Sequence, residues 1–151
     1  MPQHNSLDFT LQFGPFPDAA AHRRVVTGAN VRRWVGMALD CAAEIAVRVV
    51  GEDEGRALNR EYRHKDYATN VLTFDYARSP MVVADIVLCA PVVQREAIAQ
   101  GKPLKDHYAH LLVHGVLHAQ GYDHESGESG ALEMEALETL LLAALGIPNP
   151  Y

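Results

Sequence analysis

The sequence predicts a single α+β domain in which four short strands and about five helices share one core. Four segments have the alternating or β-branched pattern of strands, and five longer segments have the apolar period of helices. The 151 residues are enough to bury one core, and no repeat, low-complexity segment or linker separates a second domain. We therefore expect residues 1–151 to form one unit.

The first part of the chain is expected to contain two strands with a helix between them. Apolar and polar side chains alternate over residues 7–13, which is the period of a half-buried strand, and a Gly- and Pro-rich run at residues 14–18 ends it. Asn30 can cap a helix over residues 30–40, where apolar side chains recur at helical spacing. Residues 45–49 then form a second strand.

The middle of the chain is expected to contain a helix, two strands and another helix. The first helix spans residues 52–65 and begins with three acidic side chains, which interact favourably with the N-terminal end of the helix dipole. Residues 70–75 and 82–88 are rich in β-branched side chains and are predicted strands. The next helix starts at Pro91 and reaches about residue 100.

A helix predicted over residues 104–119 carries the most informative pattern in the sequence. Because residues four apart lie on one helix face, His114 and His118 can reach the same metal ion. Gly121 can adopt the left-handed conformation that ends a helix, so the chain can turn and bring His124 to the same point. Three imidazoles leave the fourth position of a tetrahedral zinc open for water, which is the catalytic arrangement.

The spacing of these histidines is also that of metallopeptidases, in which a glutamate general base follows the first histidine. Here Gly115 follows His114, so the usual base for peptide hydrolysis is missing. A structural zinc is another alternative, but such sites are normally closed by a fourth protein ligand and rich in cysteine, and no cysteine lies near this motif. Asp85, in a predicted strand, either orients a metal-bound histidine or is an ordinary edge-strand acid.

Beyond the histidine motif, residues 125–130 are expected to form a polar turn and residues 132–145 an amphipathic last helix. Glu133, Glu135 and Glu138 are expected on the solvent face of that helix, where they supply much of the negative charge.

The formal net charge of −6 does not suggest a nucleic-acid-binding protein, so a polyanionic partner would need a local basic patch. One dense group of basic side chains occurs towards the end of the helix at residues 52–65, and its members are Arg56, Arg60, Arg63 and Lys65. These side chains either complement the helix dipole in solvent or contact an anionic substrate, with Arg60 and Lys65 as candidate substrate-binding residues.

The composition is that of a soluble globular protein, and we expect a cytoplasmic protein with no membrane association. The apolar share of 48% and the charged share of 21% are ordinary, and no apolar run approaches the roughly 20 residues that cross a bilayer. Residues 1–8 lack the basic and apolar regions of a secretory signal. Cys41 and Cys89 are too few for a disulfide framework and are expected in the core.

Three blocks of the sequence share a pattern with a known family. They are residues 58–66 with 69–74, residues 84–86, and residues 114–124, followed by Met134-Glu135 and Glu138 in the last helix. They resemble the LN..YR.KD..T[DN]VLSF stretch, the GDI element and the HGxLHxxGYDH signature of the YbeY family of bacterial endoribonucleases, also called rRNA maturation factors. The similarity extends over roughly residues 45–146.

This resemblance implies a single-strand-specific, zinc-dependent endoribonuclease that acts in rRNA processing, including maturation of the 16S 3′ end, and in ribosome quality control. It implies that His114, His118 and His124 hold one Zn²⁺ ion and that Arg63 is the required, catalytic arginine. It also implies a small mixed four-stranded sheet with a zincin-like metal site on a central helix. The expected partners are single-stranded RNA, rRNA and the ribosomal subunit, and a monomer is expected.

Two other functions fit the same residues. One is a zinc peptidase-like hydrolase that takes its base from elsewhere, and the other is a non-catalytic ribosome-assembly factor with a structural zinc. For a ribonuclease, the sequence assigns no proton acceptor. Hydrolysis by an activated water leaves a 3′-hydroxyl and a 5′-phosphate, whereas attack by the RNA's own 2′-hydroxyl leaves a 2′,3′-cyclic phosphate.

Overall fold

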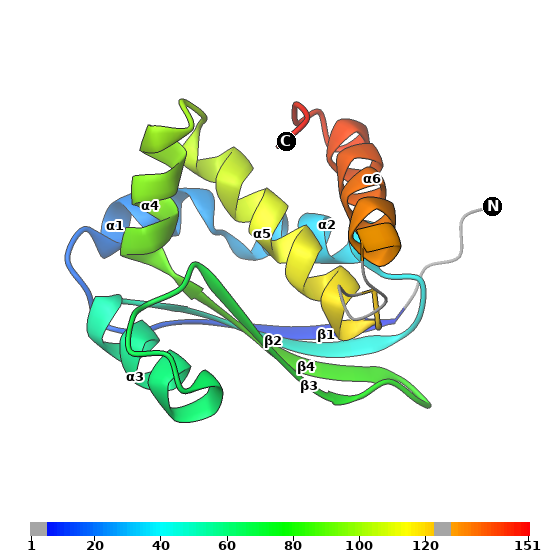
Figure 1. The fold of residues 1–151 in the computed structure, drawn as a ribbon, viewed down its shortest axis with the longest axis horizontal. Coiled ribbons are helices and arrows are strands. Elements are labelled where there is room, and N and C mark those ends of the chain that lie inside the picture. Colours follow the sequence, from blue (N-terminus) through cyan, green and yellow to red (C-terminus); the bar gives the residue numbers. More distant parts are fainter. Residues whose placement is uncertain (1–5, 123–127) are drawn as a thin grey trace.

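The computed structural model describes residues 6–122 and 128–151, and its centre is a mixed sheet (Figure 1). The strands are β1 (Leu7–Phe13), β2 (Ala43–Val50), β3 (Val71–Ala77) and β4 (Val82–Cys89), in the spatial order β1-β2-β4-β3. β1, β2 and β4 run parallel, and β3 pairs antiparallel with β4 at one edge. The expected mixed sheet of four strands is confirmed.

Helices cover the two faces of the sheet unequally. They are α1 (Ala19–Val25), α2 (Gly28–Ala38), α3 (Glu52–Arg63), α4 (Ala90–Ala99), α5 (Leu104–Ala119) and α6 (Glu128–Ala144). Figure 1 shows α3 on one side of the sheet and the other helices on the opposite side. The central position expected for the histidine-bearing helix is confirmed, because α5 contacts α2, α4, α6, β3 and β4.

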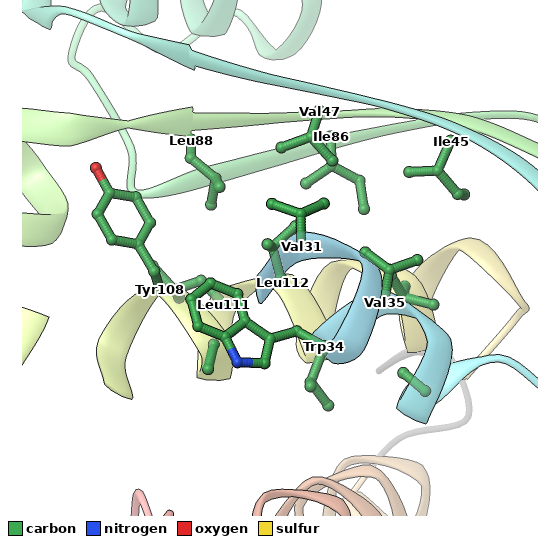
Figure 2. Packing of buried hydrophobic residues seen from close by; sticks show 14 of the residues in the cluster. Val31, Trp34, Val35, Ile45, Val47, Ile86, Leu88, Tyr108, Leu111 and Leu112 are labelled. Atoms are coloured by element: carbon green, nitrogen blue, oxygen red, sulfur yellow. The ribbon is translucent and has the colours of Figure 1, made fainter. Parts of the chain in front are cut away.

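The main core lies between the sheet and the helices α2 and α5 (Figure 2). Because side chains alternate across a strand, Ile45 and Val47 of β2 point to the same face as Ile86 and Leu88 of β4. They pack with Trp34 of α2, and all five side chains are at most 1% exposed. Leu112 of α5 is buried in the same core. Each fully buried aliphatic side chain of this kind contributes about 1.5–3 kcal/mol to stability, so α2 and α5 are firmly held on the sheet.

α3 packs on the opposite face through a smaller apolar cluster. The cluster consists of Val50, Leu72, Val87 and Cys89, with Leu58 of α3 packed against it. Gly55 allows α3 to approach closely, since a Cβ atom there would lie 2.9 Å from the sulfur of Cys89. Cys89 is thus the core residue that the sequence predicts, whereas Cys41 is only half-buried.

Two ion pairs attach the first turn of α3 to its neighbours. Glu54 accepts hydrogen bonds from Arg48 of β2 at 2.6 and 3.0 Å, and Glu52 accepts from Arg95 of α4 at 3.1 and 3.2 Å. These side chains are more than a third exposed, so each pair contributes at most about 1 kcal/mol. Their main effect is to orient α3, which carries Arg63 at its other end.

Three details of the helices differ from what the sequence predicts. Residues 19–25 form α1, which the apolar pattern does not predict, so the described residues contain six helices. Thr27, and not Asn30, caps α2, because Oγ1 of Thr27 accepts a hydrogen bond at 3.1 Å from the backbone N–H of Asn30 inside the first turn. α6 begins at Glu128, within the residues expected as a polar turn.

Among the described residues, no helix combines the length and apolar character needed to cross a membrane.

Candidate active site

A cavity of about 580 Å³ lies along the edge strand β3, between the end of α3 and α5. Its walls are Tyr62, Arg63, Thr69, Asn70, Val71, Leu72, Thr73, Phe74, His114 and His118. Because β3 has a neighbour on one side only, its outer backbone groups are not used by the sheet. Arg63 precedes His114 by 51 residues and His118 by 55 residues in the sequence. The fold brings these three side chains to one cavity.

His114 and His118 project from the same side of α5, as their spacing predicts. Their rings are parallel, with 6° between the planes and 6.5 Å between the centroids. Gly121 has a positive φ of 100°, in agreement with the expected turn after the helix. His124, the third expected ligand, lies outside the described residues.

The described residues hold no group of three His, Cys, Asp or Glu side chains that could bind a metal. The pair His114 and His118 still fits a cation that prefers nitrogen ligands, because both imidazoles line one cavity from a rigid helix.

Behind His114 lies the carboxylate of Glu138, whose side chain is 1% exposed. One carboxylate oxygen accepts a hydrogen bond from Nδ1 of His114 at 3.0 Å and lies 3.3 Å from Nε2 of His110. The other accepts from the hydroxyl of Tyr151 at 2.8 Å. Burial alone would raise the pKa of Glu138, but the hydrogen bonds from His110, His114 and Tyr151 lower it to about 2. The expectation that Glu138 faces solvent is therefore wrong.

The burial of Glu138 has a signal in the sequence. Met134, Glu138 and Leu142 recur at steps of four along α6, and all three are buried. A carboxylate in such an apolar stripe needs hydrogen-bond partners. Because Nδ1 of His114 donates to Glu138, Nε2 is the ring nitrogen that could bind a cation, as is usual for a histidine with a carboxylate behind it.

Arg63 is the last residue of α3 and extends into the cavity wall. The helix ends there because His64 adopts a left-handed conformation with φ of 58°. Within residues 6–122 and 128–151, the guanidinium of Arg63 forms no ion pair. An exposed guanidinium without an ion pair in the described part of the chain thus lines the same cavity as the histidine pair.

The other basic residues of α3 lie outside the cavity walls. Arg56 donates two hydrogen bonds to Asp66, at 2.9 and 3.0 Å, and Arg60 lies 3.7 Å from the same carboxylate. The hydrogen bond from Arg56 lowers the pKa of Asp66. The role of Arg60 and Lys65 as substrate contacts stays a prediction.

A polar network that the sequence does not predict fixes the start of β3. Asn70 accepts from the backbone N–H of Val71 at 2.6 Å and donates to Glu96 of α4 at 3.0 Å. Glu96 also contacts Nε2 of the buried His107 on α5, at 2.8 Å. The network links β3, α4 and α5, so the cavity wall at Thr69 and Asn70 has a defined shape. The only local signal is an asparagine before a strand, a residue type that often bonds to nearby backbone.

Gly115 lies where α5 is closest to the sheet. A Cβ atom at this position would be 3.2 Å from both Oγ1 of Thr73 and Cδ1 of Ile86. At the sequence position where metallopeptidases have a glutamate, this chain therefore has a glycine that allows the helix to pack closely on the sheet.

Asp85 does not take part in the cavity. It lies on the opposite face of β4, where its carboxylate accepts a hydrogen bond from the hydroxyl of Tyr76 at 2.9 Å. The carboxylate that accepts a hydrogen bond from a cavity histidine is that of Glu138, and not that of Asp85 as the sequence allowed.

Sequence comparison connects the chain to a single family. A model of the endoribonuclease YbeY family matches residues 21–146. Proteins named endoribonuclease YbeY from Polaromonas sp., Paracidovorax citrulli and Methylibium petroleiphilum are 65%, 60% and 59% identical to this chain over 145, 147 and 150 residues. These alignments cover 96%, 97% and 99% of this chain and 94%, 97% and 97% of the relatives.

A solved structure shares the fold. The solution structure of a protein from Thermotoga maritima has a TM-score of 0.57, covering 92% of this chain and 91% of that chain at 20% sequence identity. The family match and the close relatives extend over nearly the whole length, including every wall residue of the cavity. The chain belongs to the endoribonuclease YbeY family.

Proposed function

We propose that this endoribonuclease uses one Zn²⁺ ion to cleave single-stranded RNA. Its substrate would be rRNA in the ribosomal subunit, during maturation of the 16S 3′ end and in ribosome quality control, and it would act in the cytoplasm as a monomer. Membership of the endoribonuclease YbeY family supports the reaction and RNA as the substrate class. The observation that carries the proposal is the single cavity lined by Arg63, His114 and His118.

The side chains suit a phosphodiester substrate. When bound, a divalent cation supplies polarisation of a phosphoryl oxygen and a lowered pKa for coordinated water. Nε2 of His114 and the imidazole of His118 would hold that cation, with Glu138 orienting His114. Imidazole ligands without thiolates are compatible with zinc. Arg63 can donate two parallel hydrogen bonds to the phosphate, and these strengthen as negative charge develops in the transition state.

The peptidase alternative is disfavoured by Gly115. A glutamate here would have to displace Thr73 and Ile86, which would lie only 3.2 Å from its Cβ atom. A neutral peptide bond would also gain less than a phosphodiester from the positive charge of Arg63.

Two variants test the proposal against its alternatives. We expect His114→Ala to lose most bound zinc and nearly all cleavage of a labelled single-stranded RNA. We expect Arg63→Ala to keep zinc and thermal stability but to lose cleavage, because its side chain is exposed and forms no ion pair with the residues that the structure describes. Elemental analysis, thermal unfolding and the cleavage assay measure these three properties. Full activity of Arg63→Ala would remove its role, and cleavage of an unstructured polypeptide would favour the peptidase.

The RNA ends distinguish the two chemical routes. A 2′,3′-cyclic phosphate would indicate attack by the substrate's 2′-hydroxyl, and a 3′-hydroxyl with a 5′-phosphate would indicate hydrolysis. End-specific ligation and sequencing of the products measures this directly.

A further inference from the structure

Tyr62 places an exposed aromatic ring in the wall of the cavity, directly before Arg63 in the chain. The residue is 58% exposed, although its ring is large and mostly apolar. Within residues 6–122 and 128–151, its hydroxyl has no hydrogen-bond partner that would explain a structural role. Such a ring is suited to a ligand that brings its own apolar face.

The ring of Tyr62 is held in place by its surroundings. Phe74 of β3 contacts it edge to face, with 5.0 Å between the centroids and 72° between the planes. Phe74 in turn packs on the small apolar cluster beneath α3. A ring fixed in this way loses little conformational freedom when a flat ligand stacks on it.

Tyr62 also lines a second cavity, of about 210 Å³, on the side of the sheet that α3 covers. Glu54 and Asp85 line this second cavity, and its one arginine, Arg48, is already paired with Glu54. Because Arg48 neutralises Glu54, the net negative charge of this cavity comes from Asp85, and it repels a phosphate but not an uncharged base. The two sides of Tyr62 therefore differ: the cavity of Arg63 suits phosphate, and the ring and the space beyond it suit a base.

We infer that Tyr62 is a substrate-binding residue on which a base of the RNA stacks, next to the phosphate held beside Arg63. The inference deepens the proposed function and rests on it. Only an unpaired base can turn out of a helix to reach the ring, so stacking on Tyr62 supplies a physical reason for single-strand specificity. Every base has an aromatic face, so the contact tolerates different sequences.

The test compares three variants on one single-stranded RNA whose cut site has been mapped with the zinc-loaded wild-type protein. Tyr62→Leu removes the aromatic face, Tyr62→Phe keeps it, and Tyr67→Leu is the matched control. Tyr67 is similarly exposed, at 56%, but lines neither cavity. Loss of one stacked base corresponds to a roughly 5- to 150-fold loss of affinity. We therefore expect Tyr62→Leu to raise KM by that factor, and Tyr62→Phe and Tyr67→Leu to behave as wild type. All variants should unfold at the wild-type temperature.

A second arm replaces each base beside the cut, one at a time, by an abasic nucleotide. We expect one position to weaken cleavage by the wild type and to have no further effect in Tyr62→Leu, because both changes remove the same contact. If Tyr62→Leu cleaves like Tyr67→Leu, or if every abasic position is additive with it, the inference is wrong while the proposed function stands. If the wild type cleaves no RNA, the proposed function fails and the inference with it.

Discussion

Glu138 is a carboxylate almost without solvent contact, yet it remains ionised because three side chains from two other parts of the chain surround it. His110 and His114 belong to α5, and Tyr151 belongs to the residues after α6. A buried charge with partners on each oxygen is stable, whereas losing a partner leaves an expensive uncompensated group. The carboxylate thereby fixes both the tautomer and the orientation of His114.

Glu138→Gln should therefore weaken zinc binding without unfolding the protein. An amide keeps the shape of the side chain but removes the negative charge that favours donation by His114. Loss of such a partner behind a ligand typically weakens metal affinity by roughly 10- to 100-fold. Competition with a chromophoric zinc chelator measures the affinity. Glu133→Gln, an exposed change on the same helix, should bind zinc as the wild type does. Equal affinities for the two variants would contradict the positioning role of Glu138.

At the scale of elements, the close packing of α5 on the sheet depends on Gly115, which has no side chain. Gly115→Ala adds a methyl group 3.2 Å from Thr73 and Ile86. Overpacking of this kind destabilises by about 1–3 kcal/mol, against a gain of about 1 kcal/mol from replacing a helical glycine. Gly36 in α2 is the opposite case, because no packing neighbour among the described residues lies within 4 Å of the position that an added methyl group would take. Gly36→Ala should therefore stabilise by about 1 kcal/mol.

The free energy of unfolding in urea separates these two variants. We expect Gly115→Ala to be less stable than the wild type by up to about 2 kcal/mol, with Gly36→Ala shifted in the opposite direction. Equal stabilisation by both would mean that the sheet yields to the added methyl group at no cost, and that Gly115 is not needed for close packing.

Elements with a long or regular apolar period can be predicted from the sequence. The bounds predicted for α5 are those observed, and Pro91 lies in the first turn of α4 as predicted. α1 is too short for a period to be visible, with only seven residues. It is stabilised by tertiary contacts instead, because the buried His22 bonds to Tyr108 at 2.6 Å and to Gln94 at 2.9 Å. Such contacts join residues more than 70 positions apart, and no local pattern contains them.

The candidate site likewise contains some residues that the sequence predicts and others that it does not. Helical spacing alone brings His114 and His118 together, and the family resemblance selects Arg63 from a group of four basic residues. The sequence does not reveal that Asp66 binds Arg56 and lies near Arg60, because that selection depends on how the chain turns after α3. Glu138 is missed for a different reason: a glutamate in a helix suggests solvent, and its partners come from another helix and from Tyr151.

At the scale of the whole molecule, the net charge of −6 and an RNA substrate are compatible because the charges are not evenly spread. Several acids are used internally: Glu52, Glu54 and Asp66 are paired with arginines, and Glu138 with histidines. Arg63 forms no ion pair within the described parts of the chain and lies in the cavity wall. Because salt screens charges over short distances, binding of a phosphate depends more on the arginine beside it than on the net charge of the protein.

The stability of the whole molecule should fall on mild acidification, in part because of His107. This side chain is buried between α4 and α5, with Glu96 at 2.8 Å and with Lys102 and His110 nearby. Burial lowers its pKa below the ordinary value of about 6.5, although Glu96 opposes the shift. Below about pH 6.5 the unfolded chain therefore takes up a proton that the folded chain does not, and the free energy of unfolding decreases.

The variant His107→Gln lacks this group, so the stability difference between wild type and variant should narrow as the pH falls from about 7.5 to about 5.5. Urea unfolding at several pH values measures this difference. The contributions of ionisable groups that both proteins share cancel in it. A difference that widens instead would mean that the charged pair with Glu96 outweighs burial, and that His107 is protonated in the folded protein.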